Sequence, residues 1–74
     1  MNKERRTRIG EAVSLLNDAH DILQECMDEE QEYLDNMPEN MQQGEKADAA
    51  QEAIDNLNSA IDAVDEATSA LEDI

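Results

Sequence analysis

The chain has 74 residues, and 20 acidic against 5 basic side chains give it a formal net charge of −15. A surface this acidic repels nucleic acid and anionic membranes, so we expect no direct nucleic-acid binding and no membrane association. No stretch approaches the ~20 consecutive apolar residues that span a bilayer, and no apolar signal region follows the N-terminal charges. We therefore expect a cytoplasmic location. The apolar residues are almost all Ala, Leu, Ile, Val and Met, which argues against a sheet and predicts an all-α fold.

The first expected element is a helix over about residues 3–35. From Ile9 onward, residues of one face recur in alternating steps of four and three, the spacing of a heptad seam. Two seam residues are polar, His20 and Glu30, and a polar residue there usually lowers stability while fixing register or partner choice. We interpret His20 as a register-setting or interface residue. The first seam comprises Ile9, Val13, Leu16, His20, Leu23, Met27, Glu30, Leu34 and Met37.

A second apolar stripe lies beside this seam and widens the face beyond what one partner helix would cover. It contains Leu15 and Ile22, and we expect these two residues, with His20, to take part in self-association. Cys26 lies in the same stripe and is expected to be buried, as free cysteines usually are. The full stripe comprises Ala12, Leu15, Ala19, Ile22, Cys26 and Tyr33.

Residues 36–44 are the expected connection. Pro38 disfavours helix at the residue before it, and Gly44 suits a left-handed helix cap. Pro38 can equally open one short helical turn that runs through Gln43. Both interpretations fit the sequence.

A second helix is expected over about residues 45–73, and the whole chain, residues 1–74, is expected to form one domain. Similar helix lengths and a short connection predict an antiparallel, coiled-coil-like two-helix hairpin. A chain this short supplies only a small core, so we expect self-association to complete a bundle. The second seam comprises Ala47, Ala50, Ile54, Leu57, Ile61, Val64, Thr68 and Leu71, flanked by Ala53, Ala60, Ala67 and Ile74.

The charges differ between the two ends of such a hairpin. At the open end, Arg5, Arg6 and Arg8 are expected to pair with acids near the C-terminus: Asp65, Glu66, Glu72 and Asp73. At the loop end, carboxylates crowd the last turns of the first helix, against its macrodipole, and Lys46 is the only cation. We call this loop end the acidic pole. The residues predicted there to bind a basic partner are Asp28, Glu29, Glu32, Tyr33, Asp35, Met37, Pro38, Glu39 and Met41.

Two other interpretations of the acidic pole remain open. Charged residues on a helix are usually a solvated face that keeps a protein soluble. Tyr33, Met37 and Met41 can likewise close the end of the hairpin instead of anchoring a partner.

No arrangement of residues suggests catalysis, a cofactor or a metal site. A lone cysteine and a single histidine offer no Cys/His metal framework, and the residue three before His20 is Asn17 where a helical carboxylate metal site would need Glu. There is no calcium-binding or glycine-rich phosphate loop. We therefore expect a protein that is not an enzyme.

The run from Asp28 to Gln42 carries the motif Tyr-x-Asp-Asn-x-Pro-Glu-x-x-Gln at residues 33–42, and Ala53-Ile54-Asp55-Asn56-Leu57 and Ala60-Ile61 follow. It resembles small uncharacterised acidic helical proteins of bacteriophages and mobile elements of Gram-positive bacteria. The resemblance covers roughly residues 20–72. It implies a bacterial host cell as the setting and no particular mechanism.

These features together favour a protein-binding module. We expect a phage or mobile-element accessory protein that engages a basic surface of a host protein, as an inhibitor or nucleic-acid mimic. The alternative is a structural role as a homo-oligomeric scaffold or accessory protein.

Overall fold

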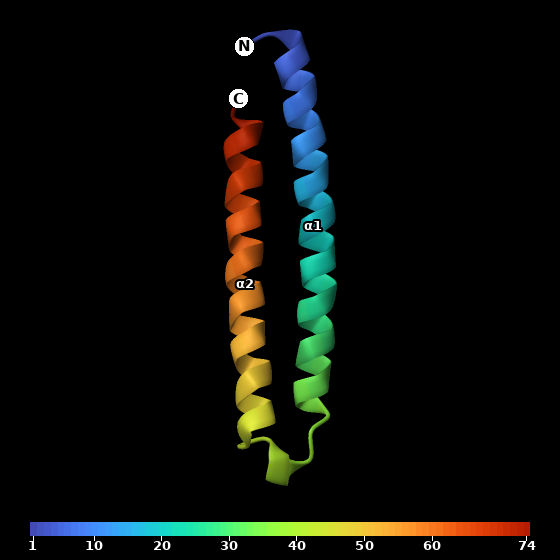
Figure 1. Ribbon diagram of the computed structural model, residues 1–74, viewed down its shortest axis with the longest axis vertical. Coiled ribbons are helices and arrows are strands. Elements are labelled where there is room, and N and C mark those ends of the chain that lie inside the picture. The colour runs from blue at the N-terminus through green and yellow to red at the C-terminus, as the bar shows by residue number, and fades with distance from the viewer.

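The computed structural model describes residues 1–74 and is an antiparallel hairpin of two long helices, which confirms the predicted all-α fold (Figure 1). α1 spans Lys3–Asp35, a short 3-10 helix η1 spans Glu39–Met41, and α2 spans Glu45–Glu72. The predicted ranges for the two long helices were 3–35 and 45–73. The molecule measures 59 × 14 × 13 Å, and its radius of gyration of 17.1 Å compares with about 11 Å for a compact domain of this length. It is therefore a rod.

Local capping explains where the helices begin and end. Asn2 caps α1, because its Oδ1 accepts a hydrogen bond of 2.8 Å from the backbone N–H of Arg5. Asn36 is the C-terminal cap residue of α1, and its N–H donates to the Glu32 carbonyl. Gly44 does not form the expected left-handed cap, since its φ of −93° and ψ of 179° are those of extended backbone. It instead precedes α2 as the N-terminal cap residue.

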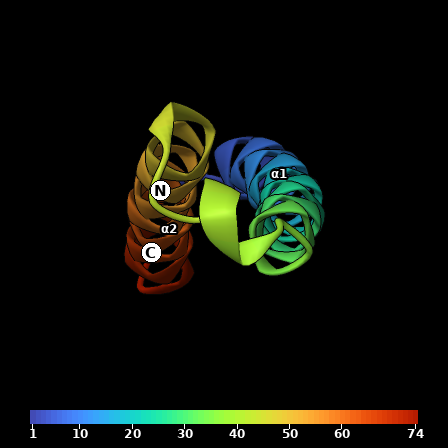
Figure 2. The same cartoon turned by 90° about the horizontal axis from the view of Figure 1, so that it is seen from below.

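The connection contains the short helical turn after Pro38 that the sequence allows, but this turn ends at Met41 and not at Gln43. Pro38 opens a short turn in which the Met41 N–H donates to the Pro38 carbonyl at 2.8 Å. Gln42 Nε2 donates to the Met37 carbonyl at 3.1 Å and ties the two sides of the turn together. Seen along the rod, η1 lies across the space between the ends of α1 and α2 (Figure 2).

The core is the line where the two seams meet. Every seam residue of both helices is buried or half-buried, as the heptad spacing predicts. Only five residues of the chain are buried, so the hairpin covers little apolar surface by itself. The buried residues are Met37, Ala47, Ala50, Ile54 and Ile61.

The second stripe is not covered by the hairpin. Cys26 is exposed, so the expectation that it is buried is wrong for the single chain. Leu15 and Ile22 are 69% and 60% exposed. Two helices shield only the sides that face each other, and η1, a three-residue turn at the loop end, does not cover the flank of α1.

Neither helix contains a segment that is both long enough and apolar enough to cross a membrane.

Candidate protein-interaction surfaces

The loop end of the hairpin carries two hollows, one on each side of the rod. The first, of about 410 Å³, lies beside Tyr33 and Met41 and is largely apolar. Its lining residues are Tyr33, Asn36, Met37, Pro38, Met41 and Lys46. The second, of about 420 Å³, is largely polar and is lined by Leu34, Asp35, Gln42, Ala47, Asp48 and Gln51.

The polar hollow brings together two carboxylates from different helices. Asp35 comes from the last turn of α1 and Asp48 from the first turn of α2. Gln31 Nε2 donates to Asp35 Oδ1 at 2.9 Å, which orients that carboxylate. Neither acid has an ion pair within the chain. The hollow can therefore receive a cationic side chain, whose stem would lie against Leu34 and Ala47.

The predicted partner-binding acids all lie on the surface. Asp28, Glu29, Glu32, Asp35 and Glu39 are exposed, and none of them forms an ion pair. Lys46, the only nearby cation, is also unpaired and lines the apolar hollow. The negative charge of the acidic pole is thus not neutralised within the chain.

The predicted apolar anchors divide into two groups. Tyr33 and Met41 are 49% and 39% exposed, and Pro38 is exposed too, so all three are accessible to a partner. Met37 is 8% exposed and belongs to the core. Its side chain therefore closes the end of the hairpin, as the alternative interpretation has it, and does not present an anchor.

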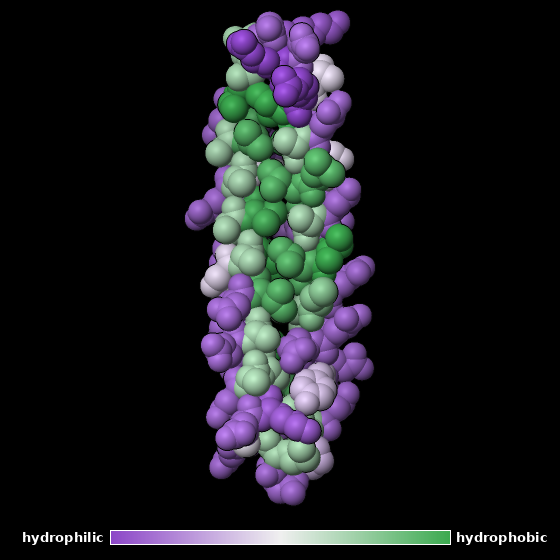
Figure 3. Space-filling model, viewed as in Figure 1, coloured by the Kyte–Doolittle hydropathy of each residue, from purple (hydrophilic) through white to green (hydrophobic).

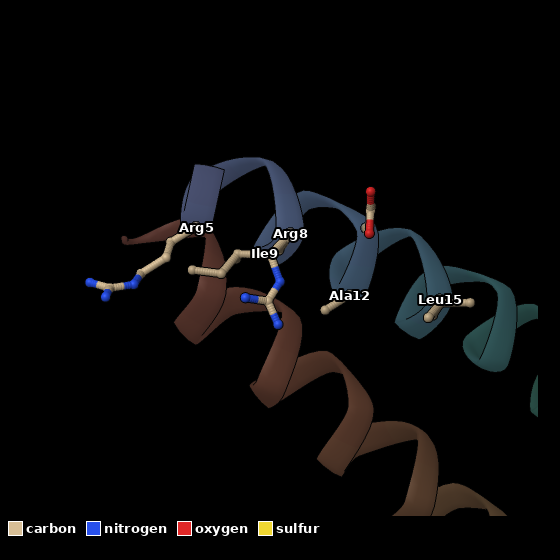
Figure 4. Close-up of a pocket in the computed structure, with 6 residues that line it drawn as sticks. Arg5, Arg8, Ile9, Ala12 and Leu15 are labelled. Carbon is tan, nitrogen blue, oxygen red and sulfur yellow. The ribbon is translucent and has the colours of Figure 1, made fainter. Parts of the chain in front are cut away.

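The open end does not neutralise itself as expected. The chain has a single ion-pair contact, between His20 and Asp65, and the three arginines of α1 have none. The reason is visible in Figure 1, where the first turns of α1 extend beyond the end of α2. Arg5 and Arg8 instead flank a hollow of about 480 Å³ that also includes Ile9, Ala12 and Leu15 (Figure 4).

Between the two ends, one face of the rod is apolar. Figure 3 shows hydrophobic residues gathered over both helices in the middle and toward the termini, whereas the loop end is mostly hydrophilic. The predicted self-association residues differ in exposure, because Leu15 and Ile22 are open to solvent while the side chain of His20 is 33% exposed and reaches Asp65.

Two features were missing from the sequence-based site. The sequence places Asp48 at the acidic pole but not among the residues predicted to bind a partner, although a hairpin that turns over residues 36–44 brings the first turn of α2 level with Asp35. The hollow beside Arg5 and Arg8 was missed because these arginines were assigned to ion pairs. α1 is longer than α2, so pairing the seam residues of the two helices from the loop to the open end predicts that the first turns of α1 extend beyond α2.

Comparison with family models, with curated proteins and with solved structures finds no match to this chain.

Proposed function

We propose that this protein is a non-enzymatic protein-binding module whose acidic pole engages a basic surface of a host protein. Its carboxylates stand in for nucleic-acid phosphates, so the module acts as an inhibitor or nucleic-acid mimic. The setting we propose is the cytoplasm of a bacterial host, with the protein encoded by a phage or mobile element. Spaced, unpaired carboxylates beside an exposed Tyr33, Pro38 and Met41 support this role.

The observation that carries the proposal is the polar hollow at the loop end. Exposed acids alone are common on soluble helices and are mostly solvated. Asp35 and Asp48 differ from these, since they come from two helices and line one concave site with Leu34 at its wall. A lysine or arginine of the partner would meet two carboxylates and an apolar contact for its stem in the same place.

Replacement of both aspartates by asparagine tests this role. The wild-type protein is used to capture partners from a bacterial lysate at low and high salt, and the affinity of the captured protein is then measured by calorimetry. We expect Asp35→Asn/Asp48→Asn to weaken binding by at least about tenfold, and wild-type binding to fall steeply with salt. The matched control is Asp62→Asn/Glu66→Gln, which removes the same charge from exposed positions of α2 far from the loop. Equal affinity of both double variants would refute the proposed site.

The second candidate function is a structural homo-oligomer. It is favoured by the exposure of Leu15 and Ile22, two large aliphatic side chains on one flank of α1. An unfolding temperature that rises with protein concentration would support this role.

A further inference from the structure

One flank of the hairpin is apolar along both helices and the other is polar. In α1, Ala12, Ala19 and Cys26 each come directly before a seam residue, and Ala53, Ala60 and Ala67 do so in α2. The residues that come directly after a seam residue are almost all polar, among them Asn17, Gln24 and Gln31 in α1 and Gln51, Asn58, Asp65 and Glu72 in α2. The two flanks of each helix therefore differ in chemistry along the middle of the rod.

The structure places equivalent flanks of the two helices on the same side of the rod. Tyr33 and Lys46, both directly before a seam residue, line one hollow, whereas Asp35, Asp48 and Gln51 line the other. The alanines of α2 consequently lie on the same side as Leu15, Ile22 and Cys26. We call this side the apolar face; it consists of Ala12, Leu15, Ala19, Ile22 and Cys26 of α1 and Ala60, Ala63, Ala67 and Ala70 of α2.

The single chain exposes more surface than a compact protein of its mass, and the excess is about what one further interface would bury. The chain exposes 5631 Å², whereas a compact monomer of its mass exposes about 4,600 Å². The excess of about 1,000 Å² is close to the ~800 Å² that each partner buries in a standard protein interface. A partner that covers the apolar face would therefore complete the fold.

We propose that a second copy of this chain occupies the apolar face in an antiparallel arrangement, with α1 lying on α1 of the second copy and the loop end of each copy lying over the open end of the other. This inference rests on the second candidate function above and specifies its interface. It is independent of the proposed binding of a basic host protein.

The pattern of residues along α1 is self-complementary about Ala19. A two-fold axis there places Ala12 level with Cys26 of the second copy and Ala19 level with its own equivalent, and it brings Leu15 to within one residue of level with Ile22. Large aliphatic side chains thus face each other on both sides of a small residue at the centre. Such alternation allows close packing across an interface.

The charges at the two ends of the apolar face obey the same symmetry. The axis through Ala19 brings Arg5 of one copy level with Tyr33 of the other, and Arg8 to within one residue of level with Glu29. All four side chains are exposed and without an ion pair in the single chain. The hollow beside Arg5, Arg8 and Ile9 is then the place where Tyr33 of the second copy would insert.

The other symmetric arrangement is disfavoured by charge. Two hairpins stacked face to face with parallel loop ends would lay α1 on α2 of the second copy. Both acidic poles would then lie at the same end of the assembly, where they repel each other. The antiparallel arrangement instead brings each acidic pole to the end where residues 1–8 hold four basic side chains and one acid.

The contact between the two helices of one chain also shows where the two-fold axis crosses α2. The contact of His20 with Asp65 shows that position 65 lies level with position 20, so the axis also crosses α2 near Asp65. On the apolar face, α2 carries Ala60, Ala63, Ala67 and Ala70 around that point. Four alanines let α2 and its equivalent approach closely, which matches a bundle held mainly by the larger side chains of α1.

The proposed dimer leaves the polar hollow free. Asp35, Asp48 and Gln51 lie on the polar flank, away from the apolar face. Both proposed interactions can therefore occur at once, and a dimer would present two such hollows on its surface.

A first test asks whether the apolar face forms the interface. Sedimentation equilibrium should give a dimer for the wild-type protein and a monomer for Leu15→Glu. The matched control is Ser14→Glu, which adds the same charge at the adjacent exposed position and should remain dimeric. Helix content by circular dichroism reports whether each variant still folds. A wild-type protein that stays monomeric at millimolar concentration would overturn both this inference and the oligomeric role.

A second test asks whether the two copies are antiparallel. Arg8→Glu alone and Glu29→Arg alone should each weaken dimerisation by about tenfold, because each creates two like-charge contacts in the dimer. A mixture of the two variants should restore wild-type affinity, since both contacts are then between opposite charges. A dimer without this restoration would overturn the antiparallel arrangement while leaving the oligomeric role intact.

A cross-linking experiment checks the position of the axis. Ala19→Cys in a Cys26→Ala background should form a covalent dimer with a short thiol-specific cross-linker, because the two thiols meet at the axis. The wild-type protein should not, since the two Cys26 thiols would be about 21 Å apart along the helices. Ser14→Cys in the same background is the outward-facing control. Cross-linking of Ser14→Cys but not of Ala19→Cys would contradict the proposed interface.

Discussion

His20 Nδ1 lies 2.9 Å from Asp65 Oδ1, in the only ion-pair contact of the chain and the one that joins α1 to α2. Nδ1 is closed off from solvent and forms no hydrogen bond, so the Asp65 carboxylate is the only charged group within reach of this atom. Asp65 is 58% exposed, and a pair this open contributes little to stability. We expect its effect to be on register, because a shifted pairing of the seams would leave the imidazole against apolar side chains.

Replacement of His20 by leucine should therefore stabilise the monomer. We expect His20→Leu to raise the free energy of unfolding by about 1 kcal/mol, because the seam gains an apolar side chain and loses only a weak ion pair. Urea unfolding followed by circular dichroism, at a fixed low protein concentration, measures the change. The control Asp65→Asn should alter stability by less than about 1 kcal/mol. A loss of stability in both variants would show that the contact is stronger than its exposure indicates.

The small core makes each buried aliphatic residue important. Ile61 is 5% exposed, and its truncation to alanine should lower the free energy of unfolding by about 2–4 kcal/mol. For a hairpin this small, such a loss is enough to unfold much of the population at room temperature. The control Ser59→Ala changes an exposed residue of the same helix and should leave the helical signal intact. A fully folded Ile61→Ala variant would mean that the core lies elsewhere.

The heptad spacing was sufficient to predict the hairpin, because a period of seven selects one face of each helix and that face is buried wherever the helices meet. The predicted seam residues from Ile9 to Leu71 are all at least half-buried. The width of the apolar face also predicted that Leu15 lies outside the contact between the two helices, but the exposure of Cys26 was not predicted. Composition shows that the flank is apolar, but only the number of elements in the structure shows that nothing in the single chain covers it.

The geometry of the candidate site depends on the turn η1 and on the relative lengths of the two helices, which heptad spacing does not predict. Met37 and Met41 are four residues apart and chemically identical, yet Met37 is buried and Met41 is 39% exposed. The difference arises from η1, whose turn directs the chain back over the end of the seam. The arginines likewise failed to meet the C-terminal acids because α1 reaches beyond α2, which depends on where the connection ends.

The two methionines should therefore respond differently to substitution. Met37→Ser should lower the free energy of unfolding by about 2–3 kcal/mol, because it leaves a cavity and a hydroxyl at the end of the core. Met41→Ser should change stability by less than about 0.5 kcal/mol, as expected for a surface position, and should reduce affinity for the proposed basic partner. Thermal unfolding and calorimetric binding separate the two effects. Loss of stability in Met41→Ser equal to that in Met37→Ser would assign both side chains to the core.

Charge placement along the helices gives a pair of substitutions with opposite expected signs. Glu32 lies in the last turn of α1, where carboxylates oppose the helix dipole, and it follows Asp28 by one turn. Glu32→Gln should raise the free energy of unfolding by about 0.5–1 kcal/mol by removing both unfavourable interactions. Glu45 lies in the first turn of α2, where a carboxylate is favourable, so Glu45→Gln should lower it by about 0.3–1 kcal/mol.

Each of the two variants removes one acid from the loop end, so both lose the same amount of overall charge repulsion. A difference between their unfolding free energies therefore reports the position of each carboxylate along its helix. Thermal unfolding at low ionic strength should show the difference, and it should shrink at about 1 M salt, where the Debye length is near 3 Å. Stabilisation by both substitutions would instead show that the total charge of −15, and not the position of each carboxylate along its helix, controls the stability of this end.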